Sequence, residues 1–290
     1  MPDSGSTTAA ALAARYGLER ASRRPTFVDY LREMWTRRYF ILAFARARTL
    51  TQYSEARLGQ FWQVLTPLMN AALYYFVFGK LLGTDRGVQN FVAFLCIGMF
   101  VFSFLQRSIT ASAKSISGNL SLIRALHFPR ACLPLGYVLI HLNQLLVSMG
   151  VGIVIVLLTG EPIRVQWLMI VPDLLIASVF AAGICLLVAR IGAQLPDISQ
   201  LLPFVLRAWL YPSGVFYSIE HIGFTDSRPW LRDVMMANPA TVYIEIARAA
   251  FLEEFTVHPH AWEWGVGWAL VSLAAGVVVF WRAEDRYGRG

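Results

Sequence analysis

The sequence predicts an all-α integral membrane protein with six transmembrane helices. Of its 290 residues, 57% are hydrophobic and only 15% are charged, and the mean hydropathy is +0.52. A soluble domain usually carries about 25% charged residues. The net charge is +7, but ten of the 25 Lys and Arg residues precede Phe61, ahead of the first long apolar stretch. This distribution indicates contact with anionic membrane lipid and not with nucleic acid.

Six stretches have the length and composition of membrane spans, since a transmembrane helix needs about 20 mostly apolar residues. Polar residues interrupt three of them: Arg107 the second, His141 and Gln144 the third, and Arg207 with Pro212 the fifth. Asp173 lies near the start of the fourth. The predicted spans are Phe61–Leu82, Phe91–Ser112, Cys132–Thr159, Trp167–Ala189, Leu201–Ile219 and Trp262–Trp281.

The distribution of Lys and Arg predicts that both termini are cytoplasmic. With that orientation the inner segments carry 18 Lys and Arg residues, Arg207 aside, and the outer segments carry six. Cytoplasmic loops of membrane proteins hold such an excess. We therefore divide the chain into a flexible cytoplasmic N-terminus (1–25), an amphipathic helix and lead-in (26–60), a six-helix membrane domain (61–281) and a cytoplasmic tail (282–290).

An amphipathic helix is predicted ahead of the first span, over residues 26–44. Its apolar face would contain Phe27, Leu31, Met34, Trp35, Ile41 and Leu42, and Arg32, Arg37 and Arg38 would lie opposite. A basic amphipathic helix beside a span is typical of one lying in the membrane interface. The alternative is a soluble helix that packs on a partner protein. Both interpretations place it on the cytoplasmic side.

The inner loop between spans two and three is predicted to contain a short helix. Asn119 or Ser121 can cap it, and Pro129 would end it. The apolar residues Leu122, Ile123 and Leu126 in a cytoplasmic loop indicate a protein partner. The alternative is a loop that folds back on its own helices.

The outer segment 223–260 contains a helix signal at its centre. Asn238 supplies an N-cap and Pro239 the first helical position. The helix over 240–252 would have Tyr243, Ile246 and Ala250 on one face, with Glu245 and Arg248 elsewhere. Because it is too short and too charged to span, we expect one or two re-entrant helices that form an outer gate. The candidate gate residues are Asn238, Pro239, Tyr243, Ile246 and Arg248.

Motifs for chemistry are missing from the sequence. It contains no GxxxxGK[ST] phosphate loop, no HExxH, no GxSxG and no CxxC. His258 and His260 alone are a weak metal signal, so no metal site is predicted. The three cysteines are expected to be buried hydrophobic residues. If the protein uses energy, that energy would therefore come from another chain.

Three segments together resemble the ABC-type polysaccharide export permeases, which export O-antigen, teichoic acid and capsule. Residues 53–69 (YSEARLGQFWQVLTPLM) are similar to the family's entry into its first span. Residues 118–135 (GNLSLIRALHFPRACLPL) resemble its G-N-x-S-L-I-x-x-x-x-F-P-R stretch, and Asn238–Arg248 its N-P-x-x-x-x-I-E-x-x-R stretch. The resemblance covers about residue 26 to the C-terminus. Two departures are Arg207, and Tyr211-Pro212-Ser213 where the family often has S-P-V.

The resemblance implies a homodimeric permease in the bacterial plasma membrane, bound to two copies of a separate ABC ATPase that carries ATP and Mg. The amphipathic residues Phe27, Leu31, Met34, Trp35, Arg37 and Arg38 would lie beside the ATPase. The cytoplasmic coupling helix that contacts it would contain Asn119, Leu120, Ser121, Leu122, Ile123, Arg124, Leu126, His127, Phe128, Pro129 and Arg130. The pore would pass a lipid-linked polysaccharide along Phe76, Phe100, Phe104, Trp209, Tyr211, Phe216 and Tyr217.

Within this resemblance, the excess of Arg over Lys indicates an actinobacterial member, for which cell-wall galactan on a polyprenyl diphosphate would be the substrate. Two other functions are weighed against polysaccharide export. One is an ABC permease for small drugs or lipids. The other is a membrane enzyme acting on polyprenyl-linked sugars, for which Glu245, Glu253 and Glu254 form the only dense acidic group.

Overall fold

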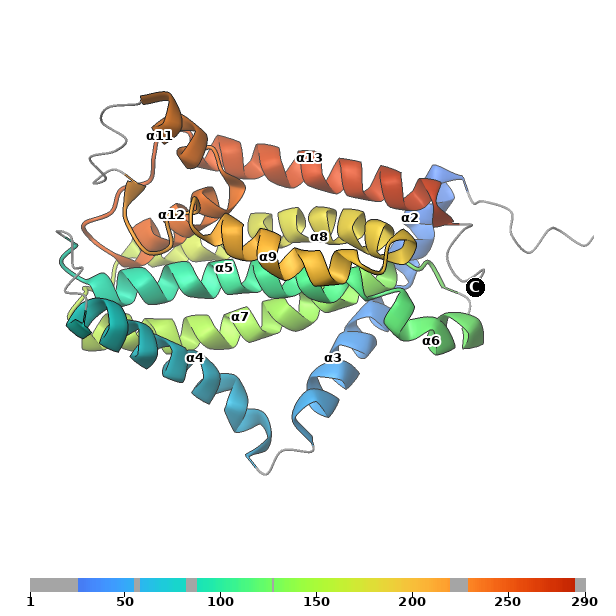
Figure 1. Ribbon diagram of the computed structural model, residues 1–290, viewed down its shortest axis with the longest axis horizontal. Helices are drawn as coiled ribbons and strands as arrows, with labels where there is room; N and C mark the ends of the chain where they lie inside the picture. Colours follow the sequence, from blue (N-terminus) through green and yellow to red (C-terminus); the bar gives the residue numbers. More distant parts are fainter. Residues whose placement is uncertain (1–25, 55–57, 82–87, 127, 220–228, 285–290) are drawn as a thin grey trace, which may run out of the picture.

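The structure is a computed structural model that describes residues 26–54, 58–81, 88–126, 128–219 and 229–284. The described residues form helices and turns, with no β-strand among them. The predicted flexible N-terminus and most of the predicted tail lie outside this part of the chain. Figure 1 shows long helices running side by side in one bundle.

Four helices in the described chain are long and apolar enough to cross a membrane. They are α5 (Phe91–Ala113), α7 (Cys132–Leu158), α8 (Ile170–Gln194) with the 3-10 turn η4 (Val165–Met169) before it, and α13 (Ala261–Arg282). They confirm the second, third, fourth and sixth predicted spans. The all-helical membrane fold is therefore confirmed in its main part.

The first and fifth predicted spans take other forms. The first is α4 (Trp62–Tyr74), which contains Pro67 and continues into a π-helix, η2 (Tyr75–Leu81). The fifth is α9 (Ile198–Leu210), and the prediction that it continues to Ile219 is wrong. Helix α9 ends at Leu210, close to Pro212, which has no backbone N–H to continue the helical hydrogen bonds, and Gly214 then adopts a left-handed φ of 63°.

Helix α5 is the centre of the bundle. Seventeen of its 23 residues are buried, and they include the fully enclosed rings of Phe94 and Phe102. The side chain of Asn90 accepts a hydrogen bond of 3.3 Å from the Ala93 amide and caps the start of the helix. A helix that is apolar on all sides must be surrounded by other helices or lipid. Here α4, α7, α8, α9 and α12 (Pro239–Phe251) all contact α5.

Helices α8 and α13 pack with their backbones in contact. A Cβ atom on Gly183 would lie 2.2 Å from the carbonyl carbon of Ser272, and one on Gly276 would lie 2.3 Å from the Gly183 oxygen. The Ser272 hydroxyl also donates to the Phe180 carbonyl at 3.3 Å. Small residues commonly allow such close packing between membrane helices.

The predicted amphipathic helix 26–44 is two helices, α2 (Phe27–Thr36) and α3 (Arg38–Ser54), which join at Arg37. Its predicted apolar face does not act as one surface. Phe27 and Met34 pack on the bundle, Phe27 against Trp281 at 5.3 Å between ring centroids, whereas Leu31 and Trp35 remain exposed, Trp35 to 72%. The most buried residue of α2 is Tyr30, which was not among the predicted ones.

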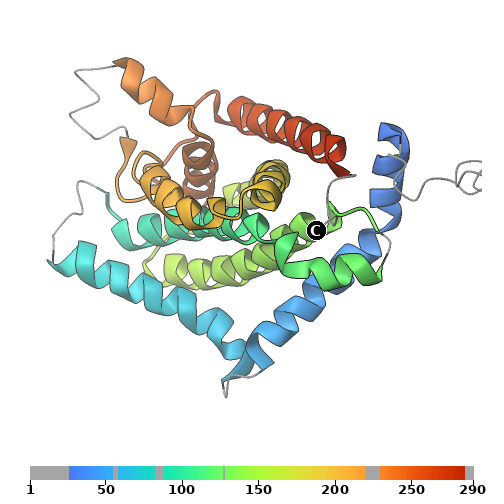
Figure 2. The ribbon, with the colours of Figure 1, turned by 45° about the vertical axis from the view of Figure 1, so that its right-hand side comes forward.

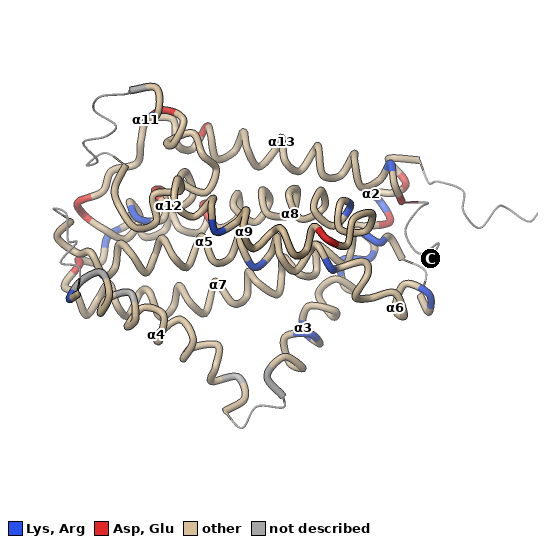
Figure 3. The backbone as a smooth tube through the Cα atoms, in the orientation of Figure 1, with Lys and Arg blue, Asp and Glu red and all other residues tan. Residues whose placement is uncertain are grey.

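The two ends of the bundle carry different structures. Figures 1 and 2 show α2 and α6 (Leu120–Ala125) at one end and α11 (Pro229–Met236) and α12 at the other. In Figure 3 the Lys and Arg residues of α2, α3 and α6 gather at the first end, and most of α7, α8 and α13 carries no charge. The predicted inner and outer elements are therefore on opposite ends.

Candidate functional site

The inner loop contains the predicted short helix, α6, preceded by a 3-10 turn at Ser117–Asn119. Asn119 occupies the N-cap position, but its side chain does not cap the helix. Its Oδ1 instead accepts a hydrogen bond of 2.6 Å from Arg48, and its Nδ2 donates to the Ser115 carbonyl at 2.8 Å and to the Tyr137 hydroxyl at 3.3 Å. Asn119 is thus buried, and its side chain joins α3 to α7.

The other predicted coupling residues divide between surface and interior. Ser121, Arg124 and Leu126 are exposed, Leu126 to 49%. Leu122 and Ile123 pack partly against the bundle, Phe128 contacts Phe40 with ring centroids 4.6 Å apart, Leu120 is half-buried and Pro129 is buried. His127 lies outside the described residues. One side of this loop therefore packs on the chain's own helices and the other is exposed, and its contact with a partner stays a prediction.

Arg130 belongs to an internal ion pair with Glu284. The Glu284 carboxylate accepts from the Arg130 backbone N–H at 2.9 Å and from the Tyr30 hydroxyl at 3.0 Å. The Arg130 guanidinium donates to the Glu284 carbonyl at 2.8 Å and lies 3.5 Å from its carboxylate. Burial raises the pKa of Glu284 and outweighs the opposing effect of the hydrogen bonds from Arg130 and Tyr30. The Arg130 side chain is also 30% exposed, so the expectation that it contacts an ATPase stays a prediction.

At the opposite end, Asn238 and Pro239 begin α12 as predicted. The Asn238 side chain accepts from the Ala240 amide at 3.2 Å and caps the helix. The same oxygen accepts from the indole N–H of Trp209 at 2.9 Å, and the amide nitrogen donates to the Ser213 hydroxyl at 3.3 Å. The cap therefore also fixes α12 to the end of α9.

Arg248 is the least expected residue of α12. The sequence places it away from the helix's apolar face, yet it is only 2% exposed. Its guanidinium donates to three carbonyls, those of Phe94 at 3.1 Å, Gly214 at 2.9 Å and Val215 at 2.8 Å. It also lies 3.4 Å from the centroid of the Phe94 ring. Arg248 thus binds α12 to α5 and to the turn after α9.

The remaining candidate gate residues are also interior. Tyr243 and Ile246 are buried, and the Tyr243 hydroxyl donates to the Gly265 carbonyl of α13 at 2.9 Å. In this conformation the candidate gate residues are therefore packed within the end of the bundle opposite α6.

The predicted pore aromatics do not converge on one surface within a single chain. Phe100 and Phe104 are buried on α5, and Trp209, Phe216 and Tyr217 are half-buried. Phe76 and Tyr211 are each 61% exposed. Phe100 and Phe104 alone among these residues line a described cavity.

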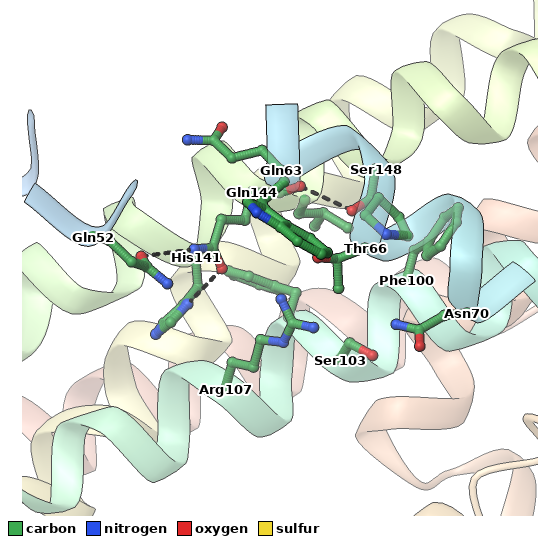
Figure 4. A pocket seen from close by; sticks show the side chains of 14 residues that line it. Gln52, Gln63, Thr66, Asn70, Phe100, Ser103, Arg107, His141, Gln144 and Ser148 are labelled. Atoms are coloured by element: carbon green, nitrogen blue, oxygen red, sulfur yellow. Dashed lines mark hydrogen bonds between the residues drawn. The ribbon is translucent and has the colours of Figure 1, made fainter. Parts of the chain in front are cut away.

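That cavity lies between α3, α4, α5 and α7 and has a volume of about 330 Å³. Figure 4 shows the side chains that line it and the contacts of Gln52 and His141 with Gln144. Small-molecule sites usually have volumes of about 300–1,000 Å³. Its lining consists of Gln52, Trp62, Gln63, Thr66, Pro67, Asn70, Phe100, Ser103, Phe104, Arg107, His141, Gln144, Leu145 and Ser148.

A hydrogen-bonded network forms one wall of the cavity. The Gln144 amide donates to the Gln52 oxygen at 3.1 Å, and the Gln144 oxygen lies 3.1 Å from Nδ1 of His141 (Figure 4). Gln52 and His141 also line a second cavity of about 500 Å³, together with Arg48 and Tyr137. The cavity wall is therefore continuous with the residues that hold Asn119.

In the sequence, His141, Gln144 and Arg107 stand out as polar residues within predicted spans, whereas Gln52, Gln63 and Asn70 have no predicted role. Their common signal is an amide or charged side chain inside or beside an apolar stretch.

Comparison with known proteins identifies the family. The model of the ABC-2 type transporter matches residues 39–252. The chain belongs to the ABC-2 type transporter family. It is 25% identical over 172 residues to the O-antigen export system permease RfbA of Klebsiella pneumoniae, covering 59% of this chain and 66% of that protein. It is 23% identical over 260 residues to the O-antigen export system permease RfbA of Myxococcus xanthus, covering 89% of this chain and 95% of that protein. It is 21% identical over 240 residues to the polysialic acid transport protein KpsM of Escherichia coli, covering 81% of this chain and 90% of that protein.

Membership of the ABC-2 family confirms the resemblance and bears on the enzyme alternative. In this family the membrane subunit is a permease and the ATPase is a separate subunit. Of the acidic residues considered for an enzyme, Glu254 has a structural contact, since its carboxylate accepts from the Gln89 backbone N–H at 3.0 Å, and the backbone N–H of Glu253 donates to Glu161 at 3.1 Å. The described residues contain no group of three or more His, Cys, Asp or Glu that could hold a metal, and Cys96, Cys132 and Cys185 are buried thiols.

Proposed function

We propose that this chain is the permease subunit of an ABC exporter that moves a lipid-linked polysaccharide from the cytoplasm to the outer side of the bacterial plasma membrane. The observation that carries the proposal is similarity along most of the chain to permeases named for O-antigen export and polysialic acid transport. The substrate would be a long glycan on a polyprenyl diphosphate.

The proposed topology has six spans, with α4–η2 and α9 as the two that accompany the four long helices. The inner end would be the one that carries α2, α6 and the C-terminal end of α13. The basic residues at that end support this orientation (Figure 3).

A homodimer would complete the transport path. The segment α4–η2 and helix α9 leave large apolar side chains uncovered, among them Met69, Leu73, Phe76 and Phe204. A second copy would cover these faces and bring Phe76 and Tyr211, which are exposed in one chain, to a shared surface. The pore aromatics would then come from both protomers.

The proposed coupling to ATP runs through α6. Its exposed residues Ser121, Arg124 and Leu126 would contact the ATPase, and movement of α6 would pass through Asn119 and Arg48 to α3. Because α3 leads into α4, this motion would tilt the first span. The outer helices α11 and α12 would open in response.

The test is reconstitution of the chain with an ABC ATPase in proteoliposomes, with delivery of lipid-linked glycan across the membrane as the readout. We expect glycan movement and ATP hydrolysis that require both chains. If deletion of the gene left the outside glycan undiminished, polysaccharide export would be excluded. Undiminished glycan together with substrate-stimulated hydrolysis by drugs or lipids would support the alternative permease.

A further inference from the structure

We propose that the cavity between α3, α4, α5 and α7 binds the phosphate–sugar headgroup of the lipid-linked glycan before transport. In this assignment Arg107 binds the phosphate and the surrounding amides and hydroxyls bind the first sugar. The inference rests on the proposed export function and names the place where that function would begin.

The first argument is the charge of Arg107. It is the one Lys or Arg residue that lines the cavity, and no Asp or Glu lines it. Within the described residues Arg107 has no hydrogen bond and no ion pair, and it is exposed to the space between the helices. An uncompensated cation inside a membrane domain is costly and marks a functional position. A guanidinium is the side chain best suited to bind phosphate through paired hydrogen bonds.

The second argument is the chemistry of the remaining lining. Four amides (Gln52, Gln63, Asn70 and Gln144) supply both donors and acceptors, as hydroxyl groups of a sugar require. Trp62 and Phe104 add aromatic rings at the same cavity. Buried polar groups at membrane depth need partners, so this many amides imply a polar occupant.

One wall of the cavity is held in a fixed arrangement by hydrogen bonds. Gln144 is held between Gln52 and His141 at 3.1 Å from each, which fixes its orientation before a ligand arrives (Figure 4). In this arrangement Nδ1 of His141 donates to the Gln144 oxygen, so Nε2 remains to accept a hydrogen bond. This Nε2 atom is buried and has no partner within the described part of the chain.

The cavity lies toward the end of the bundle that carries α6. Arg107 lies toward the Ala113 end of α5, and His141 and Gln144 lie in the first half of α7, on the side of the bundle that leads to α6. A lipid-linked glycan made in the cytoplasm presents its phosphate at the inner membrane interface. The cavity therefore lies on the side from which such a headgroup would enter.

The experiment measures binding of undecaprenyl diphosphate to the purified full-length chain in phosphatidylcholine nanodiscs by native mass spectrometry. We expect Arg107→Gln to weaken binding by at least about tenfold, because a charge-assisted bidentate contact is lost, and Arg107→Lys to weaken it less. Lys114→Gln is the matched control, since it removes a positive charge at the C-cap of α5 and outside the cavity, and it should bind as the unaltered chain does.

Two further measurements test which phosphate compound binds and whether the sugar contributes to binding. Excess phosphatidylglycerol and inorganic pyrophosphate are added as competitors, and undecaprenyl diphosphate carrying N-acetylglucosamine is compared with the sugar-free lipid. We expect phosphatidylglycerol to compete poorly, and Gln63→Ala to remove the preference for the sugar-bearing lipid. Equal competition by phosphatidylglycerol would make the cavity a general anionic-lipid site, and displacement of the lipid by equimolar pyrophosphate would make it a site for free phosphate; either would overturn the proposal.

Unchanged binding in folded Arg107→Gln and Arg107→Lys variants would also overturn it. If Arg107→Gln does not fold, Arg107→Lys and Gln63→Ala carry the test. Arg107-dependent binding without any glycan export would leave the cavity assignment intact and refute the export function. Normal export and normal lipid binding by Arg107→Gln would refute the cavity assignment alone.

Discussion

The guanidinium of Arg48 donates a hydrogen bond of 2.6 Å to Oδ1 of Asn119 and so connects α3 to the residue from which α6 begins. Asn119 also donates to Tyr137 on α7. Arg48 and Tyr137 line the same cavity as Gln52 and His141, which border the proposed headgroup site. A contiguous set of polar contacts therefore joins the segment that would face an ATPase to the place that would hold substrate.

Breaking this contact should uncouple ATP hydrolysis from substrate. Arg48→Gln or Asn119→Ala is expected to reduce substrate stimulation of ATPase activity several-fold, because a hydrogen bond to a charged group contributes about 1.5–3 kcal/mol. ATPase assays of the reconstituted complex would measure this. Arg46→Gln, on the same helix and exposed, serves as the control. The double variant should be no worse than either single one, and strictly additive losses would show that the two residues act separately.

Arg248 is predicted to be essential for the stability of the outer end. Arg248→Met should lower the free energy of unfolding by about 3 kcal/mol or more, since three buried carbonyls lose their donor and each unsatisfied group costs about 1–3 kcal/mol. Arg248→Lys should recover little, because one ammonium cannot reach all three in the same geometry. Thermal unfolding in detergent would measure both.

Two variants test the geometry of this site. Gly98→Ala should behave like a milder Arg248 variant, because its Cβ would lie 2.5 Å from Nη2 of Arg248. Arg207→Met removes an exposed arginine on α9 and should leave the unfolding midpoint nearly unchanged. Equal destabilisation by Arg207→Met and Arg248→Met would contradict the importance of the three carbonyl contacts.

Hydropathy was sufficient to predict the four long spans, because each contains a stretch of about 20 mostly apolar residues and this signal is local in sequence. The end of α9 and the division between α2 and α3 were not predictable in this way. Both depend on a few residues that turn the chain inside a continuing apolar pattern. The interior position of Arg248 escaped prediction because its partners lie on α5 and in the turn after α9.

In the candidate site, too, features within one segment were predictable from the sequence, whereas contacts between distant segments were not. A motif identified the inner loop, and the structure confirms a short helix there. The ion pair of Arg130 with Glu284 joins residues 154 positions apart, so no spacing could have indicated it. The polar cavity was missed as a unit because its lining comes from four helices, each contributing a few amides or hydroxyls that are weak signals alone.

Glu284 should make stability depend on pH. Burial raises the pKa of its carboxyl, so the folded protein holds this proton more tightly than the unfolded chain. Its contribution is therefore fully present below the ordinary carboxyl pKa and is lost as pH rises through the raised value. Unfolding midpoints measured between about pH 4 and pH 8 should fall over that window, and Glu284→Gln should flatten the fall.

The glutamine variant is informative because its amide oxygen can still accept from the Arg130 backbone. Glu284→Ala should be less stable at every pH, since Arg130 and Tyr30 then lose a buried partner. Asp29→Asn, at an exposed carboxylate on α2, is the control for general charge effects. A pH profile identical in the unaltered chain and Glu284→Gln would show that this carboxyl titrates alike in both states.

The contact between α8 and α13 should tolerate no side chain at Gly276. Gly276→Ala would place Cβ 2.3 Å from the Gly183 carbonyl oxygen, and backbone cannot yield as a flexible side chain can, so the helices must separate and lose packing. Gly267→Ala on the same helix meets no atom within 4 Å and should be neutral or stabilising by up to about 1 kcal/mol, because alanine favours the helix. Thermal unfolding of both variants measures the difference. An unfolding midpoint for Gly276→Ala as high as that for Gly267→Ala would contradict the close contact of the two backbones. The hydrogen bond from the Ser272 hydroxyl to the Phe180 carbonyl would then also have to be absent.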